Sequence, residues 1–188
     1  MLNKTSTFLA HRLLMLGAIT EDTLDIYVYG FELLISFLFS TSMILLAGIL
    51  VGKIIETVAF LAVFIFLRSF SGGFHAKTYL ICNIVTLSTF SFVMLASHFL
   101  DTGYAAFIVL SFFGLIILII WAPIDNPNKI ITNEKKRVFK VVSLVLFAFF
   151  VMIGVTTIPF STKISSVIFY TLFVDIILIA FEVIKRMQ

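Results

Sequence analysis

The sequence predicts an all-α, polytopic integral membrane protein with about six transmembrane helices. Of its 188 residues, 61% are hydrophobic and 12% are charged, whereas soluble domains carry about a quarter charged residues. Several uncharged stretches approach the length of about 20 helical residues that a hydrocarbon core requires. Because six such helices leave no room for a separate soluble domain, we expect residues 1–188 to form a single membrane-embedded domain.

The amino-terminal part of the chain predicts a short helix followed by the first span. Three leucines share one helical face within residues 1–17, which indicates a short interfacial helix, with a frayed tail as the alternative. Thr20 and the two acidic residues after it are typical of a helix start, because threonine caps a helix and acids favour its amino terminus. We therefore expect the first long helix to begin near Thr20 and to carry the uncharged run at residues 33–51.

Five further apolar stretches complete the predicted spans. The first contains Glu56, which must lie near water or a partner, since an ionised group within a bilayer is costly. The last contains Asp175, which we expect to turn toward the protein interior for the same reason. The predicted spans cover residues 54–67, 78–100, 103–124, 141–158 and 164–184.

The basic residues predict the orientation of these spans. When both termini are placed in the cytoplasm, only Lys53 and Lys163 of the 13 Lys and Arg residues face outward. Positive charge is expected to stay on the cytoplasmic side. We therefore predict a multi-pass protein of the cell membrane, embedded in the lipid bilayer, with a cytoplasmic loop around residue 75 and a basic cytoplasmic loop at residues 129–140. Topology accounts for the net charge of +3, so no nucleic-acid partner is expected.

A polar loop at the cytoplasmic edge holds the residues best suited to chemistry. Its only cysteine, Cys82, becomes a nucleophile as the thiolate, and His75 is an imidazole that could take the thiol proton. Arg68 adds positive charge to the same segment. A straight helix from residue 75 to residue 82 would separate the pair by about 10.5 Å of rise. The dyad therefore requires a bent loop, which Gly72 and Gly73 favour because glycine tolerates positive φ.

A structural role for the same residues is the alternative. Free cysteine is among the most buried residue types, so Cys82 could simply pack, in a non-enzymatic membrane module such as a transporter or an export partner. One cysteine excludes an internal disulfide and every multi-cysteine metal site, and the three histidines are too scattered for a metal motif. We expect no metal site.

The whole segment resembles the accessory gene regulator B family (AgrB), membrane endopeptidases that process cyclic autoinducing peptides in Gram-positive quorum sensing. The resemblance lies in the order and spacing of an arginine, a glycine-rich turn, a histidine followed by alanine, and a cysteine seven residues after that histidine. Two further segments fit the same family. These matching positions are Arg68, Gly72, Gly73, His75-Ala76, Cys82, Tyr29-Gly30-Phe31-Glu32 and Trp121-Ala122-Pro123.

The resemblance implies a cysteine endopeptidase with a Cys-His dyad, in which Cys82 is the nucleophile and His75 is the general base and acid. Its substrate would be an AgrD-like propeptide, cut in its C-terminal part through an acyl-enzyme thioester and then cyclised to a thiolactone or a lactone. Plain hydrolysis of another membrane-bound peptide is the second alternative. The resemblance implies no metal or organic cofactor, and a homodimer is one arrangement that it leaves open.

Other polar residues could support catalysis or substrate binding, and each also has a structural explanation. Arg68 would hold a propeptide carboxylate or orient the catalytic loop, although topology alone also favours an arginine there. The basic residues Lys129, Lys135 and Lys136 would receive an acidic propeptide tail or else anchor the chain to lipid. Asp175 could orient His75, as acids do in hydrolase triads, but nothing in the sequence joins their two segments and we do not predict that triad.

Overall fold

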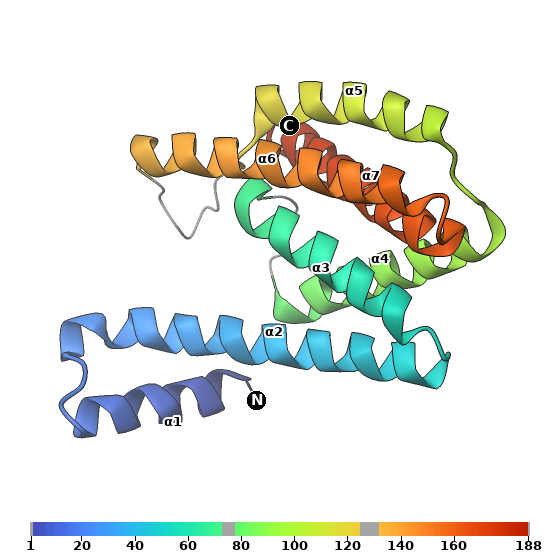
Figure 1. Cartoon of the computed structure of the whole chain (residues 1–188). Helices are drawn as coiled ribbons and strands as arrows, with labels where there is room; N and C mark the ends of the chain where they lie inside the picture. The colour runs from blue at the N-terminus through green and yellow to red at the C-terminus, as the bar shows by residue number, and fades with distance from the viewer. Residues whose placement is uncertain (1, 73–77, 125–131, 188) are drawn as a thin grey trace. The chain divides into compact units, whose positions relative to one another are not determined.

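A computed structural model describes residues 2–72, 78–124 and 132–187, and every regular element in these ranges is helical (Figure 1). Six helices are long and apolar enough to cross a membrane, which confirms the predicted all-α polytopic fold. The elements are α1 (Leu2–Met15), the 3₁₀-helix η1 (Glu21–Thr23), α2 (Leu24–Leu50), α3 (Ile54–Ser71), α4 (Tyr79–Phe99), α5 (Tyr104–Trp121), α6 (Asn133–Thr157) and α7 (Thr162–Met187).

Several predicted boundaries differ from the structure, as α3 does by ending at Ser71 rather than at residue 67, and two of the differences have local reasons. Helix α5 ends at Trp121 rather than at residue 124, because Pro123 disfavours a helical conformation at Ala122, which is extended. Helix α6 begins at Asn133, eight residues before the predicted span. The basic segment from residue 133 to residue 140 is therefore helical and not a loop, since Glu, Lys and Arg are good helix formers outside the membrane as well.

The chain divides into two compact units, residues 1–47 and residues 48–188. In the first unit, the predicted amino-terminal helix is present as α1, and the Asn3 side-chain amide donates to Glu32 Oε1 of α2 at 2.9 Å. The predicted start near Thr20 is also confirmed, because Thr20 precedes η1 and its N–H donates to Thr23 Oγ1 at 3.3 Å.

The second unit is a helical bundle in which α7 packs against each of the other four helices, α3 to α6. Helices α5 and α6 interlock through glycine and phenylalanine. A Cβ atom at Gly114 would clash with the buried ring of Phe147, and one at Gly154 would lie 2.5 Å from the buried ring of Phe107. Small residues let membrane helices approach closely, so each ring here fills the space that a glycine leaves.

The bundle has two ends, which we name after one residue of each. The Gly72 end holds the α3–α4 and α5–α6 connections and the carboxyl terminus of α7 (Figure 1). The Lys163 end holds the α2–α3, α4–α5 and α6–α7 connections.

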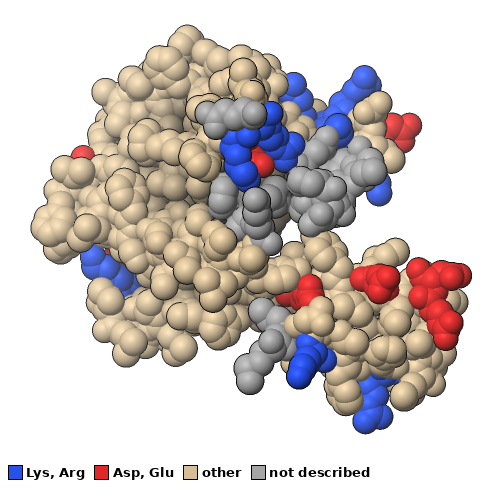
Figure 2. Space-filling model, turned by 180° about the vertical axis from the view of Figure 1, so that it is seen from behind, with Lys and Arg blue, Asp and Glu red and all other residues tan. Residues whose placement is uncertain are grey.

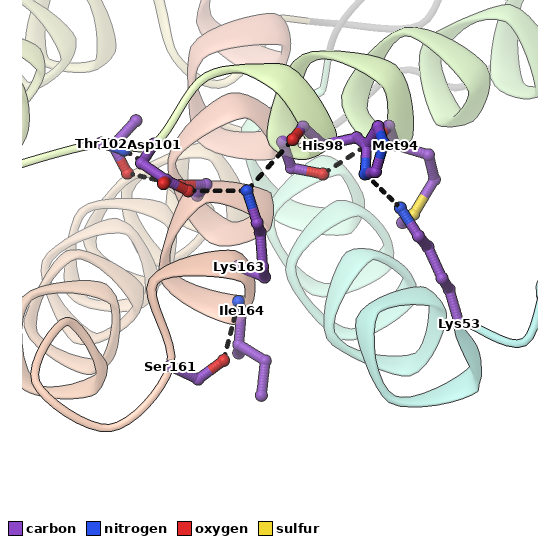
Figure 3. Close-up of polar contacts among 10 residues, drawn as sticks. Lys53, Met94, His98, Asp101, Thr102, Ser161, Lys163 and Ile164 are labelled. Atoms are coloured by element: carbon purple, nitrogen blue, oxygen red, sulfur yellow. Dashed lines mark hydrogen bonds and ion pairs between the residues drawn. The ribbon is translucent and has the colours of Figure 1, made fainter.

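Polar side chains tie the Lys163 end together (Figure 3). Lys163 Nζ donates to Asp101 Oδ1 at 2.9 Å and to the His98 carbonyl oxygen at 3.1 Å. Lys53 Nζ lies 3.4 Å from His98 Nδ1. The two basic residues that were predicted to face outward therefore both lie at this end, each against a group on or just after α4.

Candidate active site

The predicted nucleophile, Cys82, lies on the first turn of α4. Thr78 caps this helix with an extended backbone, and its side chain accepts a hydrogen bond from the Ile81 N–H at 3.4 Å. The Cys82 N–H donates to the Thr78 carbonyl oxygen at 3.1 Å. Side chains on a helix tilt toward its amino terminus, so the half-buried Cys82 thiol leans back toward the connection that carries His75.

The other side of that connection is a turn at Gly72, the residue after α3. Gly72 has a φ of +74°, a conformation that costs little only for glycine. Ser71 accepts a hydrogen bond from the Ile124 N–H at 3.0 Å. A Cβ atom at residue 72 would lie 2.5 Å from the Ile124 carbonyl oxygen. Both the backbone conformation and the close approach of the segment after α5 therefore require glycine here.

Arg68 lies in the last turn of α3, and its guanidinium points back toward the membrane-spanning part of that helix. It lies over the ring of Phe64, one turn earlier, with 5.2 Å between the guanidinium carbon and the ring centroid. Phe64 is buried. An arginine placed only by membrane topology would extend toward water instead, so topology alone does not explain this orientation.

Basic side chains surround the Gly72 end. Phe70 of α3 packs edge-on against Phe139 of α6, with 5.6 Å between the ring centroids, so the first turns of α6 lie beside the end of α3. These turns carry the exposed Lys135 and the half-buried Lys136. Figure 2 shows Lys and Arg side chains gathered at this end, with a smaller group on the opposite side.

One buried acid lies among these basic residues. Glu182 of α7 accepts from Lys185 Nζ at 3.3 Å and from Arg186 Nε at 3.1 Å. The acid therefore offsets part of the positive charge that α7 brings to the Gly72 end.

The structure places the predicted site residues in two groups. Arg68, Gly72, Cys82, Lys135 and Lys136 all lie at the Gly72 end, on or beside α3, α4 and α6. The other three, Gly73, His75 and Lys129, lie outside the described residues. Because α4 begins at Tyr79 after an extended Thr78, the straight helix that would have separated residues 75 and 82 is excluded.

One contact of this end and one electrostatic relation were not predicted. The hydrogen bond between Ser71 and Ile124 joins two connections far apart in the sequence, and no sequence signal marks it. Asp175 lies buried at the middle of α7, and Arg68 is the group whose charge acts on its carboxyl. The acid itself was visible in the apolar run, but the influence of the Arg68 charge on it was not. Within the described ranges, no group of three His, Cys, Asp or Glu side chains could hold a metal ion.

Comparisons with known proteins agree with the resemblance seen in the sequence. The chain is 31% identical over 120 residues to a putative AgrB-like protein of Clostridium perfringens (strain SM101 / Type A), which covers 60% of this chain and 56% of that protein. It is 23% identical over 158 residues to a putative AgrB-like protein of Halalkalibacterium halodurans, which covers 82% and 77%. With the accessory gene regulator protein B of Staphylococcus saprophyticus it shares 26% identity over 125 residues, or 66% of each chain.

These matches differ in how much they cover. The Clostridium alignment spans little more than half of that relative, and no solved structure shows significant similarity to the chain. The family match is much longer and takes in α1 to α6 and most of α7, residues 2–181. The chain therefore belongs to the accessory gene regulator B family.

Proposed function

We propose that this protein is a membrane cysteine endopeptidase that cuts and cyclises an AgrD-like propeptide for quorum sensing. The observation that carries the proposal is the position of Cys82 on the first turn of a capped helix. The turn follows directly on the connection that carries His75, which is only three residues before the Thr78 cap. The sequence thus supplies an imidazole within a short length of chain from a thiol at a helix amino terminus.

The chemistry of the first step follows from these two side chains. Cys82 Sγ attacks the scissile carbonyl carbon while His75 takes the thiol proton. The carbon–nitrogen bond then breaks, the leaving amine receives the proton from His75, and the acyl group remains on Sγ as a thioester. Backbone N–H groups and the dipole at the start of α4 favour both the thiolate and the negative charge of the tetrahedral intermediate.

The thioester has two fates. Attack by water releases a linear product, whereas attack by a cysteine or serine within the bound peptide releases a thiolactone or a lactone and returns the Cys82 thiol. Exchange between a thioester and a thiol is nearly isoenergetic, so ring closure depends on holding the internal nucleophile close to the acyl carbon and keeping water away.

The basic surface at the Gly72 end supports a role in binding the propeptide. Lys135 is exposed there, Lys136 is half-buried, and both lie on the first turns of α6 beside the end of α3. An acidic propeptide tail would find complementary charge on this surface. The same charge distribution supports a cytoplasmic Gly72 end, because only Lys53 and Lys163 of the basic residues were predicted to lie on the other side.

The test is the intact mass of a candidate propeptide after incubation with the purified full chain in lipid. We expect cleavage and an acyl adduct with the wild type, and neither with Cys82→Ala. A product one water lighter than the linear peptide would show ring closure, whereas a linear product would indicate plain hydrolysis.

A histidine at the other end of the bundle provides the matched control. His75→Gln should remove cleavage, whereas His98→Gln alters contacts with Lys53 and with the Phe99 ring at the Lys163 end and should retain it. Equal cleavage by the wild type and by Cys82→Ala would contradict the proposal and favour a structural cysteine in a transporter or export module.

A further inference from the structure

Asp175 is a buried acid without an evident role in the packing of α7. It is 3% exposed, and within the described part of the chain its Oδ2 atom has no hydrogen-bond partner. It lies close to the middle of α7. An ionisable side chain at such a depth normally pairs with another group and marks a functional position.

Arg68 of α3 and Asp175 of α7 each bury a polar side-chain atom, Arg68 Nη1 and Asp175 Oδ2, and the charge of the guanidinium acts on the carboxyl. Helices α3 and α7 pack against each other and both begin at the Lys163 end. Arg68 is fourteen residues beyond the start of α3, and Asp175 is thirteen residues beyond the start of α7. Each residue is thus about 20 Å along its helix, so the two lie at the same depth. The Arg68 guanidinium lies over the Phe64 ring, one turn earlier in α3. It is therefore directed to the depth at which Asp175 lies and not away from the bundle at the Gly72 end.

The position of Cys82 along α4 gives its depth relative to Arg68 and Asp175. Helix α4 runs the other way and also packs against α7. Cys82 is seventeen residues from its last residue, Phe99, which is the end of α4 near Lys163. Cys82 therefore lies about one helical turn closer to the Gly72 end than Arg68 and Asp175 do.

The last turn of α3 connects Arg68 to the turn that leads to His75. The Gly72 N–H donates to the Arg68 carbonyl oxygen at 3.2 Å. The Ser71 carbonyl oxygen accepts a hydrogen bond from the Ile124 N–H. Fixing the Arg68 side chain consequently fixes the point from which the connection to His75 departs.

We propose that Asp175 is a positioning residue, whose carboxylate pairs with the inward-pointing Arg68 guanidinium inside the bundle and holds the last turn of α3 in place for catalysis. This inference rests on the proposed function. It also decides between the two roles predicted for Arg68, because a guanidinium that is neutralised within the protein orients the catalytic loop and does not hold a carboxylate of the propeptide.

The test measures kcat and KM for propeptide cleavage by the full chain in lipid. Asp175→Asn keeps the shape of the side chain without its charge, and we expect kcat to fall roughly tenfold with KM nearly unchanged. Arg68→Gln should lower kcat to a similar extent. The kcat of the double variant should be no lower than that of the slower single variant, since the two residues act as one unit. Asp175→Glu, which keeps the charge, should recover most of the rate.

Asp101→Asn is the matched control, because it removes the acid of an ion pair at the Lys163 end and should leave kcat unchanged. A rise in KM for Arg68→Gln with no effect of Asp175→Asn would overturn the inference and assign Arg68 to the propeptide. Additive losses in the double variant would overturn it as well. If Asp175→Asn does not fold, the yield of folded protein from the double variant tests the pairing instead. Replacing both residues should restore folding only if they pair.

A second readout does not depend on peptidase activity. Cys82 is the only cysteine, so its alkylation by iodoacetamide, followed by intact mass, reports on this thiol alone. Removing the Asp175 charge should make the net charge near the thiol more positive, stabilise the thiolate and speed alkylation at neutral pH severalfold. The double variant should return to the wild-type rate, whereas a general loosening of the fold would keep alkylation fast and overturn the inference. If the wild type shows no turnover, the proposed function fails while this readout still tests the pair.

Discussion

The two ends of the bundle use polar residues in different ways. At the Lys163 end, the connections are three or four residues long, and side chains bridge them, as Lys163 does with Asp101 and Thr102 does with Ser166. At the Gly72 end, the α3–α4 connection has seven residues and the α5–α6 connection has eleven. Short connections whose polar groups are mutually bonded serve stability, whereas longer ones on a rigid scaffold often carry function.

This difference teaches that polarity alone does not locate an active site in a membrane protein. Each end has a lysine and an acid, and a histidine occurs in the sequence of the α3–α4 connection as well as in α4 near the Lys163 end. His98 is engaged by Lys53 and Lys163 at the Lys163 end, while the Gly72 end combines a half-buried thiol with an internal carboxyl and a basic surface.

The largest expected contrast is between the two histidines. His75→Gln should lower the rate of propeptide cleavage by about 10²–10⁴-fold, because it removes the proposed general base and acid. His98→Gln should change the rate by less than about twofold, since it alters only exposed contacts with Lys53 and Phe99 at the Lys163 end. Cleavage rates of the two purified variants in lipid measure this contrast. A similar loss in both variants would show that the two ends are not functionally distinct.

The next contrast is between two glycines with the same backbone conformation. Gly72 has a φ of +74° and would clash with Ile124 if it carried a Cβ atom, while Gly52 has a φ of +69° and open space around it. Gly52→Ala should cost only the strain of the left-handed backbone, about 1 kcal/mol. Gly72→Ala should cost about 2–3 kcal/mol in total, because the Ile124 segment must also move.

Thermal unfolding of both glycine variants in the same detergent checks this difference, and propeptide cleavage adds a second measurement. Gly72→Ala should lose activity even at temperatures where it remains folded, whereas Gly52→Ala should not. Equal destabilisation by the two substitutions would mean that the contact with Ile124 contributes nothing beyond backbone strain.

A smaller effect on stability is expected midway along the bundle, where α5 and α6 interlock. Gly114→Ala places a methyl group against the ring of Phe147 and should destabilise the bundle by about 1–3 kcal/mol. Gly30→Ala has open space around it within α2 and should stabilise that helix slightly. Unfolding temperatures give the sign in each case. Cleavage per folded molecule should stay the same in Gly114→Ala, which separates packing from chemistry.

Charge reversal should distinguish the basic surfaces of the two ends. Lys135→Glu with Lys136→Glu should raise KM for a propeptide with an acidic tail by roughly tenfold, with kcat nearly unchanged, because complementary charge is lost from the binding surface. The effect should shrink at high salt. Lys53→Glu at the other end is the control, and an equal rise in KM there would indicate attraction by net charge and not a docking surface.

The sequence predicted the spans well because their signal is local. Length and hydropathy alone place six helices, and the Thr78 cap and Gly72 turn follow from the residues themselves. The start of α6 was displaced because a span records only the hydrocarbon part of a helix, and the end of α5 was displaced because Pro123 disfavours a helical conformation at Ala122. The position of the Arg68 guanidinium over the buried Phe64 ring could not be predicted, since it depends on how these side chains pack. Site residues could thus be chosen from the sequence, but not their partners.

The smallest expected effect concerns the ion pair that gives the Lys163 end its name. Lys163 and Asp101 are 45% and 57% exposed at their side chains, and exposed pairs contribute less than about 1 kcal/mol. Lys163→Met should therefore lower the unfolding temperature only slightly and leave cleavage unchanged. The shift should shrink further when Asp101 is already replaced by Asn. A loss of activity in Lys163→Met without a loss of stability would extend the functional site to this end, because no mechanism confined to the Gly72 end would produce it.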